Sequence, residues 1–401
     1  MTRAPLATGL AAAVDAALIT DMVGWRRHLH ARPELSSQEH ETTRFIADLL
    51  ESWGLEVQRE LPTGAVARVR GRRSVGPTIA LRADIDALPV TERSGVEFAS
   101  TVPGRMHACG HDGHTAMLLA AARVLAAERD GLEGEVRLIF QPAEETIEGG
   151  ARPLVETGVM DGVDAVLGLH LWSELPTGAV GVTPGPVLAS MDEFRVVVRG
   201  AGGHGAQPHK GRDALLTAAH LVTAMQSLVS RRVDPMEPAV VTVGTFRAGT
   251  AFNVLADEAR LTGTVRSLSE DVRSRLAAEL ETIVREGASS FGTKAEFEYL
   301  RGAPVLVNDR GMVELVAGVA DAIVGTDRVT AMKPMMGGDD FAEYARLAPG
   351  AYAFVGAAPA GGAFPHHHPR FAIDEAALEI GLRLLLAATG RFLCAARTDR
   401  D

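Results

Sequence analysis

The chain has 401 residues, more than one hydrophobic core usually organises, so two domains are expected. Its formal net charge of −11 argues against nucleic acid or an anionic membrane as a partner, because both bind basic surfaces. Two cysteines cannot form a disulfide framework, which favours a reducing compartment. There is no secretory leader pattern and no uncharged window of transmembrane length, so we expect a cytoplasmic protein.

Short apolar runs alternate with amphipathic stretches in the first part of the chain. Strands are predicted at 78–81, 136–140 and 165–169, and a helix is predicted at 114–128. The apolar face of this helix would consist of Met117, Leu118, Ala121 and Leu125. Continuous apolar strands separated by helices indicate an α/β fold with a mostly parallel sheet covered on both faces. We expect this larger α/β domain to comprise residues 1–184 and 301–401.

The middle of the chain has a different pattern, in which two predicted strands follow one another between two helices. The predicted order is strand 192–199, helix 212–231, strands 239–246 and 259–267, helix 269–288 and strand 294–300. This β-α-β-β-α-β order is typical of a ferredoxin-like α+β unit, which we expect as an insertion over residues 185–300. The larger domain then resumes with a predicted helix 312–324, strand 351–355 and helix 374–393.

Residues 106–115 concentrate metal-binding chemistry in a glycine-flanked loop. Cys109 and His111 lie two positions apart in it, and thiolate and imidazole are ligands of zinc-like ions. Taken singly, a cysteine is usually a small buried apolar residue and a histidine a satisfied polar one. Polar residues also follow several predicted strands, however, and the carboxyl edge of an open α/β sheet is where ligands bind. Together these features favour metal ligation.

Two acidic residues and one histidine follow buried strands. Glu144 and Glu145 come shortly after the strand 136–140, and adjacent acids are most often solvated surface. Beside a metal, one of them could ligate the ion while the other acts as general base towards water. His170 follows the strand 165–169, where ligation is a better explanation than an ordinary strand end.

Other candidates remain open from the residues alone. Asp86 is equally compatible with a turn and with a carboxylate that orients a ligating histidine. The loop 364–369 holds three consecutive histidines, and spacing does not choose a ligand among them. The glycine-rich segment 200–205 lacks the Lys-Ser/Thr ending of a phosphate-binding loop, and the chain has no Gly-x-Ser-x-Gly elbow of a serine hydrolase.

Many ordered segments match the motifs of one known family. They are Leu29-His30 with Pro33–Ser36, Leu81–Pro89, Met106–Asp112, Gln141–Glu145, Gly203-His204, Phe252–Val254, Gly263–Arg266, Gly338–Phe341 and His367–Pro369. Through these segments the chain resembles the peptidase family M20 metalloenzymes, specifically their amidohydrolase branch. That branch includes hippurate hydrolases, N-acyl-amino-acid amidohydrolases and plant auxin-conjugate hydrolases. The departures are Arg32 for a common His, Ala256 for a frequent Pro and Asp339 for a frequent Glu, none of which removes a ligand.

The resemblance implies a site with two divalent metal ions per subunit, which could be zinc, manganese, cobalt or nickel. The implied metal ligands are Cys109, His111, Glu145, His170 and His367. Glu144 matches the general base, and Asp86 matches an acid that supports the metal site. His204 matches a residue that helps to hold the substrate carbonyl from the partner subunit, and Asn253 and Arg266 match substrate contacts. The inserted domain would then serve as a lid and as the interface of a homodimer.

The expected reaction is hydrolysis of an N-acyl amino acid, hippurate-like or N-acetylated, to a carboxylate and a free amino acid. A dipeptidase, carboxypeptidase or aminoacylase of the same family is a close alternative. A catalytically silent metal-bound binding protein belongs to a different class, and the presence of every ligand and of the base argues against it.

Overall fold

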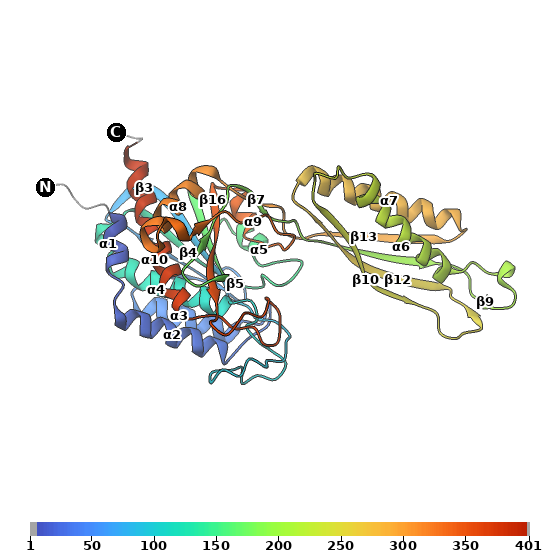
Figure 1. The fold of residues 1–401 in the computed structure, drawn as a ribbon, viewed down its shortest axis with the longest axis horizontal. Coiled ribbons are helices and arrows are strands. Elements are labelled where there is room, and N and C mark those ends of the chain that lie inside the picture. The colour runs from blue at the N-terminus through green and yellow to red at the C-terminus, as the bar shows by residue number, and fades with distance from the viewer. Residues whose placement is uncertain (1–5, 399–401) are drawn as a thin grey trace. The chain divides into compact units, whose positions relative to one another are not determined.

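The computed structural model describes residues 6–398, and these form two compact units (Figure 1). The first unit comprises residues 6–185, 307–333 and 343–398, and the second comprises residues 186–306 and 334–342. The second unit is therefore inserted into the chain of the first. None of the helices within residues 6–398 is both long and apolar enough to span a membrane.

A mixed sheet of eight strands forms the centre of the first unit. In spatial order these are β1 (Val57–Gln58), β2 (Ala65–Arg70), β4 (Glu133–Gln141), β3 (Arg73–Asp84), β5 (Ala165–Pro176), β16 (Gly350–Ala358), β6 (Val180–Gly181) and β15 (Val329–Thr330). The central strands β4, β3, β5 and β16 are parallel to one another. Strands β2 and β6 flank this core and run antiparallel to β4 and β16, respectively. The predicted mostly parallel sheet is confirmed.

Burial on both faces explains why the central strands are continuous apolar runs. In β3 the consecutive residues Ile79, Ala80 and Leu81 are all fully buried, although neighbouring side chains point to opposite faces. The helices of this unit are α1 (Leu6–Ala12), α2 (Ala16–His30), α3 (His40–Ser52), α4 (His111–Ala127), α5 (Ala151–Glu156), α8 (Arg310–Val324), α9 (Ala342–Ala345) and α10 (Ala376–Thr398). Helix α10 packs against both α4 and α8 and also contacts the central strands.

Helix α4 differs from its prediction in two respects. It begins at His111 rather than at His114, directly after Gly110, whose left-handed φ of 96° suits a residue without a side chain. It is also buried around most of its circumference, since Ala116, Ala120 and Ala122 are inaccessible along with the predicted apolar face. The reason is that α2 and α10 both pack on α4, in addition to the strands beneath it.

The second unit has a four-stranded antiparallel sheet and two long helices. The strand order is β10 (Ala239–Ala248), β12 (Glu258–Ser267), β8 (Asp192–Arg199) and β13 (Lys294–Arg301), with α6 (Ala214–Arg231) and α7 (Glu270–Ser290) packed on them. On β8, Phe194, Val196 and Val198 are buried while the residues between them are more exposed. The predicted ferredoxin-like unit is confirmed. Two short strands, β9 (Gly203–His204) and β11 (Val254–Leu255), form a separate pair.

Short elements complete the fold. Strands β7 (Gly185–Leu188) and β14 (Leu306–Asn308) lie where the chain passes between the units, and single turns of 3-10 helix occur at Arg129–Gly131, Pro208–Lys210 and Thr326–Arg328. Side-chain caps fix the starts of the two long helices of the second unit. Asp213 accepts hydrogen bonds from the backbone of Leu215 and Leu216, and Ser269 accepts one from Val272.

Candidate metal centre

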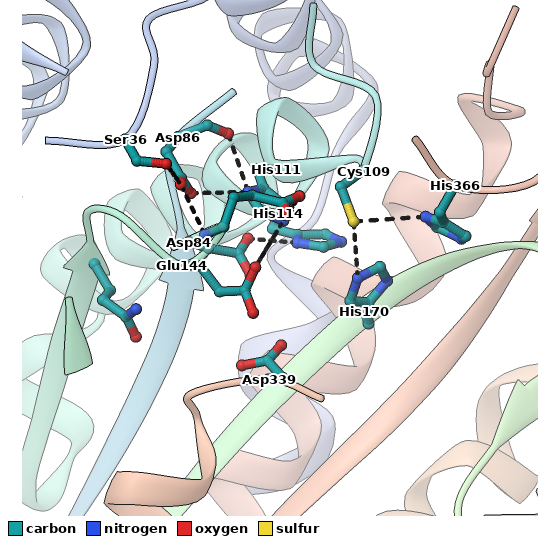
Figure 2. Close-up of polar contacts among 12 residues, drawn as sticks. Ser36, Asp84, Asp86, Cys109, His111, His114, Glu144, His170, Asp339 and His366 are labelled. Atoms are coloured by element: carbon teal, nitrogen blue, oxygen red, sulfur yellow. Dashed lines mark hydrogen bonds and ion pairs between the residues drawn. The ribbon is translucent and has the colours of Figure 1, made fainter. Parts of the chain in front are cut away.

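The polar residues of the predicted site gather at the carboxyl edge of the central sheet (Figure 2). Asp84 is the last residue of β3, and Glu144 follows the end of β4 by three residues. Strand β5 continues to Pro176, beyond its predicted end, but its pairing with β3 stops at Gly168. His170 therefore lies two residues beyond that pairing. His111 is the first residue of α4, so its side chain starts from the same edge.

The five predicted metal ligands come together within the first unit. Each of three groups has candidate ligand atoms that all lie within 4.8 Å of one another. The groups are Cys109 with His111 and His170, Cys109 with Glu145 and His367, and His111 with Glu144 and Glu145. Because Cys109 belongs to two of these groups, its sulfur lies between two clusters of nitrogen and oxygen donors.

Backbone carbonyls fix the orientation of two histidines. The Nδ1 of His111 lies 3.0 Å from the carbonyl oxygen of Asp86, which can only accept, so Nδ1 carries the proton. Its Nε2 is turned towards Glu144 and Glu145, whose oxygens lie 4.0 and 3.9 Å away. In the same way His170 donates from Nδ1 to the carbonyl of Leu171 at 2.9 Å, which leaves its Nε2 lone pair facing the Cys109 sulfur at 3.6 Å.

His114 has no ring nitrogen left for a metal. Its Nε2 accepts a hydrogen bond from the backbone N–H of Leu171 at 2.9 Å, and its Nδ1 donates to the Asp84 carboxylate at 2.6 Å. Asp84, His111 and His114 also lie close enough to resemble a ligand group. The hydrogen bonds of His114 favour a supporting role for it instead.

One buried oxygen shows that the site fits a cation. Oε1 of Glu145 is inaccessible and has no hydrogen-bond partner among the described residues, although Nε2 of His367 lies 3.3 Å from it. An unsatisfied buried carboxylate oxygen is costly, and a divalent cation would satisfy it. Sulfur, imidazole nitrogen and carboxylate oxygen form the donor set of zinc-like metals.

The electrostatics of the site also favour positive charge. Burial opposes ionisation of Asp84, but His111 and Arg82 outweigh it and hold the pKa of Asp84 well below its usual range. Burial likewise opposes the charged form of His111, yet the carboxylates of Asp84 and Asp86 raise the pKa of His111 to about 10. A metal that binds His111 must displace a proton, so metal binding and deprotonation are coupled there.

Two residues of the site have a left-handed backbone that is unfavourable for a side chain. They are Ala143, with φ of 55°, and His367, with φ of 66°. Each is held by a hydrogen bond from its own N–H, to Oε1 of Glu39 and to the carbonyl of Ala108 respectively, both at 2.8 Å. Such strain costs of order 1–3 kcal/mol and collects at functional sites. Here the left-handed backbone at Ala143 and at His367 determines where the side chains of Glu144 and His367 point.

Comparison with known proteins identifies the family. The sequence model of Peptidase family M20/M25/M40 matches residues 80–390. The chain belongs to this family. An N-acyl-L-amino acid amidohydrolase of Geobacillus stearothermophilus is 49% identical over 294 residues, which are 73% of this chain and 79% of the relative. A thermostable carboxypeptidase of Saccharolobus solfataricus is 41% identical over 362 residues, 89% of this chain and 91% of the relative.

A solved structure agrees with this assignment. The crystal structure of a dinuclear metal-binding peptidase of the M20 family from Bacillus subtilis matches with a TM-score of 0.80 and 37% identity, over 94% of this chain and 99% of that one. The chain is thus a metal-dependent M20 hydrolase that acts on amide or peptide bonds. The resemblance seen in the sequence is confirmed.

Asp86 lies behind the M20 site, where it holds three separate groups. Besides orienting His111, its carboxylate accepts a hydrogen bond from the Ser36 hydroxyl at 2.7 Å and one from the backbone N–H of Glu145 at 3.0 Å. Asp86 is fully buried. Burial opposes its ionisation, but the hydrogen bond with His111 lowers the pKa of Asp86. Of the two readings of Asp86 left open by spacing, this geometry favours support of a ligand.

A second buried network holds the start of α4. Asp112 pairs with Arg26 at 3.0 Å and with Nδ1 of His30 at 2.9 Å, and the other ring nitrogen of His30 lies 3.1 Å from Glu92. Burial opposes the charged form of His30, but Asp112 and Glu92 raise its pKa to about 9. Neighbouring His107 has no hydrogen-bond partner for either ring nitrogen among the described residues, and burial lowers its pKa to about 4.

One histidine of the site was not predicted from the sequence. His366 lies beside Cys109, with its Nδ1 3.7 Å from the sulfur (Figure 2). Burial, with His114 next in importance, lowers the pKa of His366 to about 3. His368 is directed elsewhere, since its ring stacks on Phe364 and its Nδ1 accepts from the backbone of Arg370. Spacing alone does not separate the three neighbours, because the left-handed turn at His367 decides where each ring points.

The predicted substrate residues lie in the second unit. His204 and Asn253 are brought close together, since β9 pairs with β11 and Gly205 donates to the Asn253 carbonyl at 2.7 Å. Both side chains are exposed. Arg266 is separate from them, near the far end of β12, where its Nε donates to Thr264.

Proposed function

We propose that the chain is a binuclear metal-dependent amidohydrolase that cleaves N-acyl amino acids to a carboxylate and a free amino acid. Hippurate-like and N-acetyl substrates fit this class. The observation that carries the proposal is the buried, unsatisfied Glu145 oxygen among sulfur and nitrogen donors, with Glu144 beside it. The likeness to an N-acyl-L-amino acid amidohydrolase over 73% of the chain supports the substrate class.

The proposed roles follow from the contacts of each residue. The metals would be held by Cys109, His111, Glu145, His170 and His367. When bound, divalent cations supply Lewis acidity towards a carbonyl oxygen and make water more acidic. Glu144 would take the proton of the attacking water and later deliver it to the departing amine. Asp86 would keep the His111 ring oriented through Nδ1.

The second unit would complete the site in a homodimer. We assign to it the roles of lid and dimer interface, with His204 of the partner subunit holding the substrate carbonyl. Asn253 and Arg266 would contact the substrate. Exposure of His204 and Asn253 supports this assignment, because both side chains are available to a ligand.

A carboxypeptidase or dipeptidase is the second candidate. It is favoured by one observation, the 41% identity with a thermostable carboxypeptidase over 89% of the chain. The ligand geometry serves both reactions, since each breaks an amide bond next to an amino acid.

A metal-reconstituted substrate screen tests the proposal. Metal-free protein would be loaded separately with zinc, manganese, cobalt or nickel and assayed with benzoyl-glycine, N-acetyl amino acids and dipeptides. The proposal expects kcat/KM to be highest for an acylated amino acid. Preferential cleavage of dipeptides would establish the second candidate instead. Metal-loaded protein that is inactive on all three classes would indicate a binding protein.

A further inference from the structure

His366 is not among the predicted ligands, yet its ring is closely packed beside the site. Its ring stacks on Trp172 with centroids 4.5 Å apart and lies 4.9 Å from the ring of Phe371. The loop that carries it is also tied down, because the Ser173 hydroxyl donates to the carbonyl of Phe364 at 3.0 Å. Such a clamp fixes the direction of both ring nitrogens.

The hydrogen bonds of His366 determine where its proton lies. The backbone N–H of Ser173 lies 3.3 Å from Nε2 and can only donate, so Nε2 is an unprotonated acceptor. The ring proton is therefore on Nδ1. This Nδ1–H faces Cys109, both the sulfur at 3.7 Å and the backbone of the same residue.

His366 and His367 both lie close to Cys109, but only His367 belongs to a group of candidate ligands. His367 belongs to the group of candidate ligand atoms that includes Cys109 and Glu145. Among the described residues, His366 belongs to none of these groups, although it touches the same sulfur. A nitrogen that carries its proton cannot also ligate a metal.

We infer that His366 is a positioning residue that donates a hydrogen bond from Nδ1 to the Cys109 thiolate and so orients and tunes that ligand. The inference rests on the proposed metal centre, in which Cys109 binds the ion. A hydrogen bond to a ligating sulfur lowers the energy of its lone-pair electrons and thereby changes the metal–sulfur bond. Removal of partners of this kind costs 10–100-fold in metal affinity.

Cobalt spectroscopy can test the hydrogen bond without an activity assay. The protein would carry Cys394→Ser, so that every sulfur-to-cobalt absorption band comes from Cys109. His366→Asn keeps a donor nitrogen near the Nδ1 position, whereas His366→Gln places its amide near the Nε2 position and leaves Cys109 without a donor. His366→Phe keeps a ring between Trp172 and Phe371 but removes both nitrogens. His368→Gln is the matched control, two residues away.

The expected result separates these variants. His366→Gln and His366→Phe move the sulfur-to-cobalt band to longer wavelength and weaken Co²⁺ binding about tenfold or more. His366→Asn and His368→Gln retain the parent band and affinity. A parent-like band in both the Gln and Phe variants would overturn the inference while leaving the metal centre intact. Absence of any sulfur-to-cobalt band in the parent protein would instead overturn Cys109 as a ligand, and the proposed centre with it.

Discussion

Glu144 and Glu145 are neighbours in the chain, but their surroundings differ. The backbone of Glu145 is anchored to Asp86, and its unsatisfied oxygen lies beside nitrogens of His111 and His367. Glu144 is also mostly buried, with its carboxylate 4.0 Å from His111. These contacts favour Glu145 as the ligand and Glu144 as the proton carrier.

Matched substitutions can distinguish the roles of the two carboxylates. We predict that Glu144→Gln lowers kcat by about 10²-fold or more, because general-base catalysis is lost, while the metal content is unchanged. Glu145→Gln is expected to lose metal as well as activity. Both are measured by steady-state kinetics and by metal analysis of the purified variants. Near-normal kcat in Glu144→Gln would refute its role as base.

His30 predicts a pH dependence of stability. Its pKa is about 9 in the folded chain and near 6.5 when unfolded, so its charged pairs with Asp112 and Glu92 stabilise the fold fully below about pH 6.5. This contribution, of order 3 kcal/mol, is lost as the pH rises through 9. Denaturant unfolding of metal-free wild type and His30→Gln should therefore differ most near pH 6 and least near pH 10. A difference independent of pH would contradict the ionic role.

The site was predictable to the extent that its chemistry is local in sequence. Cys109, His111 and the glutamate pair can be recognised as site candidates from their residue types and their positions near the ends of predicted strands. His111 and His114 look equally eligible as ligands, and they are distinguished only by long-range hydrogen bonds to Asp86 and Leu171. His366 was missed for the same reason, since its role depends on a backbone turn and on a distant strand.

Among the elements, the central strands and the long helices α4, α6, α7, α8 and α10 were predicted from the sequence, whereas the N-terminal helices were not. Helix α2 illustrates why. Its buried side includes Arg26 and His30, which are tolerated because they pair with Asp112 across the interface with α4. A buried face that contains charges has no apolar periodicity to detect. The short strands β1, β6 and β15 have two residues each, too few to show any period.

The loop that carries the glutamate pair depends on one close backbone approach. A Cβ added at Gly150 would lie 1.8 Å from the carbonyl oxygen of Pro142, so Gly150→Ala must displace the segment between β4 and α5. We predict a loss of about 1–3 kcal/mol in stability and a lower kcat, because Glu144 lies in that segment. Denaturant unfolding and steady-state kinetics measure the two effects.

Gly24 provides the control for this substitution. It lies within α2, and nothing is within 4 Å of an added Cβ. Gly24→Ala should stabilise the fold by about 0.5–1 kcal/mol and leave kcat unchanged. If Gly150→Ala behaved like Gly24→Ala, the close approach would not matter for the site.

At the scale of the whole molecule, the second unit exposes large apolar side chains. Leu215 and Leu216 on α6 are 43% and 48% exposed, and Phe246 on β10 is 41% exposed. Exposed apolar surface of this kind is typical of an interface. We predict a light-scattering mass of about twice 42.3 kDa, which falls to the monomer value in Leu216→Lys.

A second exposed residue supplies the control for the interface. Met236→Lys changes an 86% exposed side chain elsewhere in the second unit and should leave the dimer intact. A monomeric wild-type protein at high concentration would contradict both the dimer and the proposed role of the partner's His204.

We propose that two divalent cations bind to this chain at the edge of the central sheet. Anomalous diffraction from crystals of zinc-loaded protein tests it most directly, because the peaks locate the ions. We predict two peaks in the first unit, bounded by Cys109, His111, Glu145, His170 and His367. A single peak, or peaks beside Asp84 and His114 instead, would contradict it.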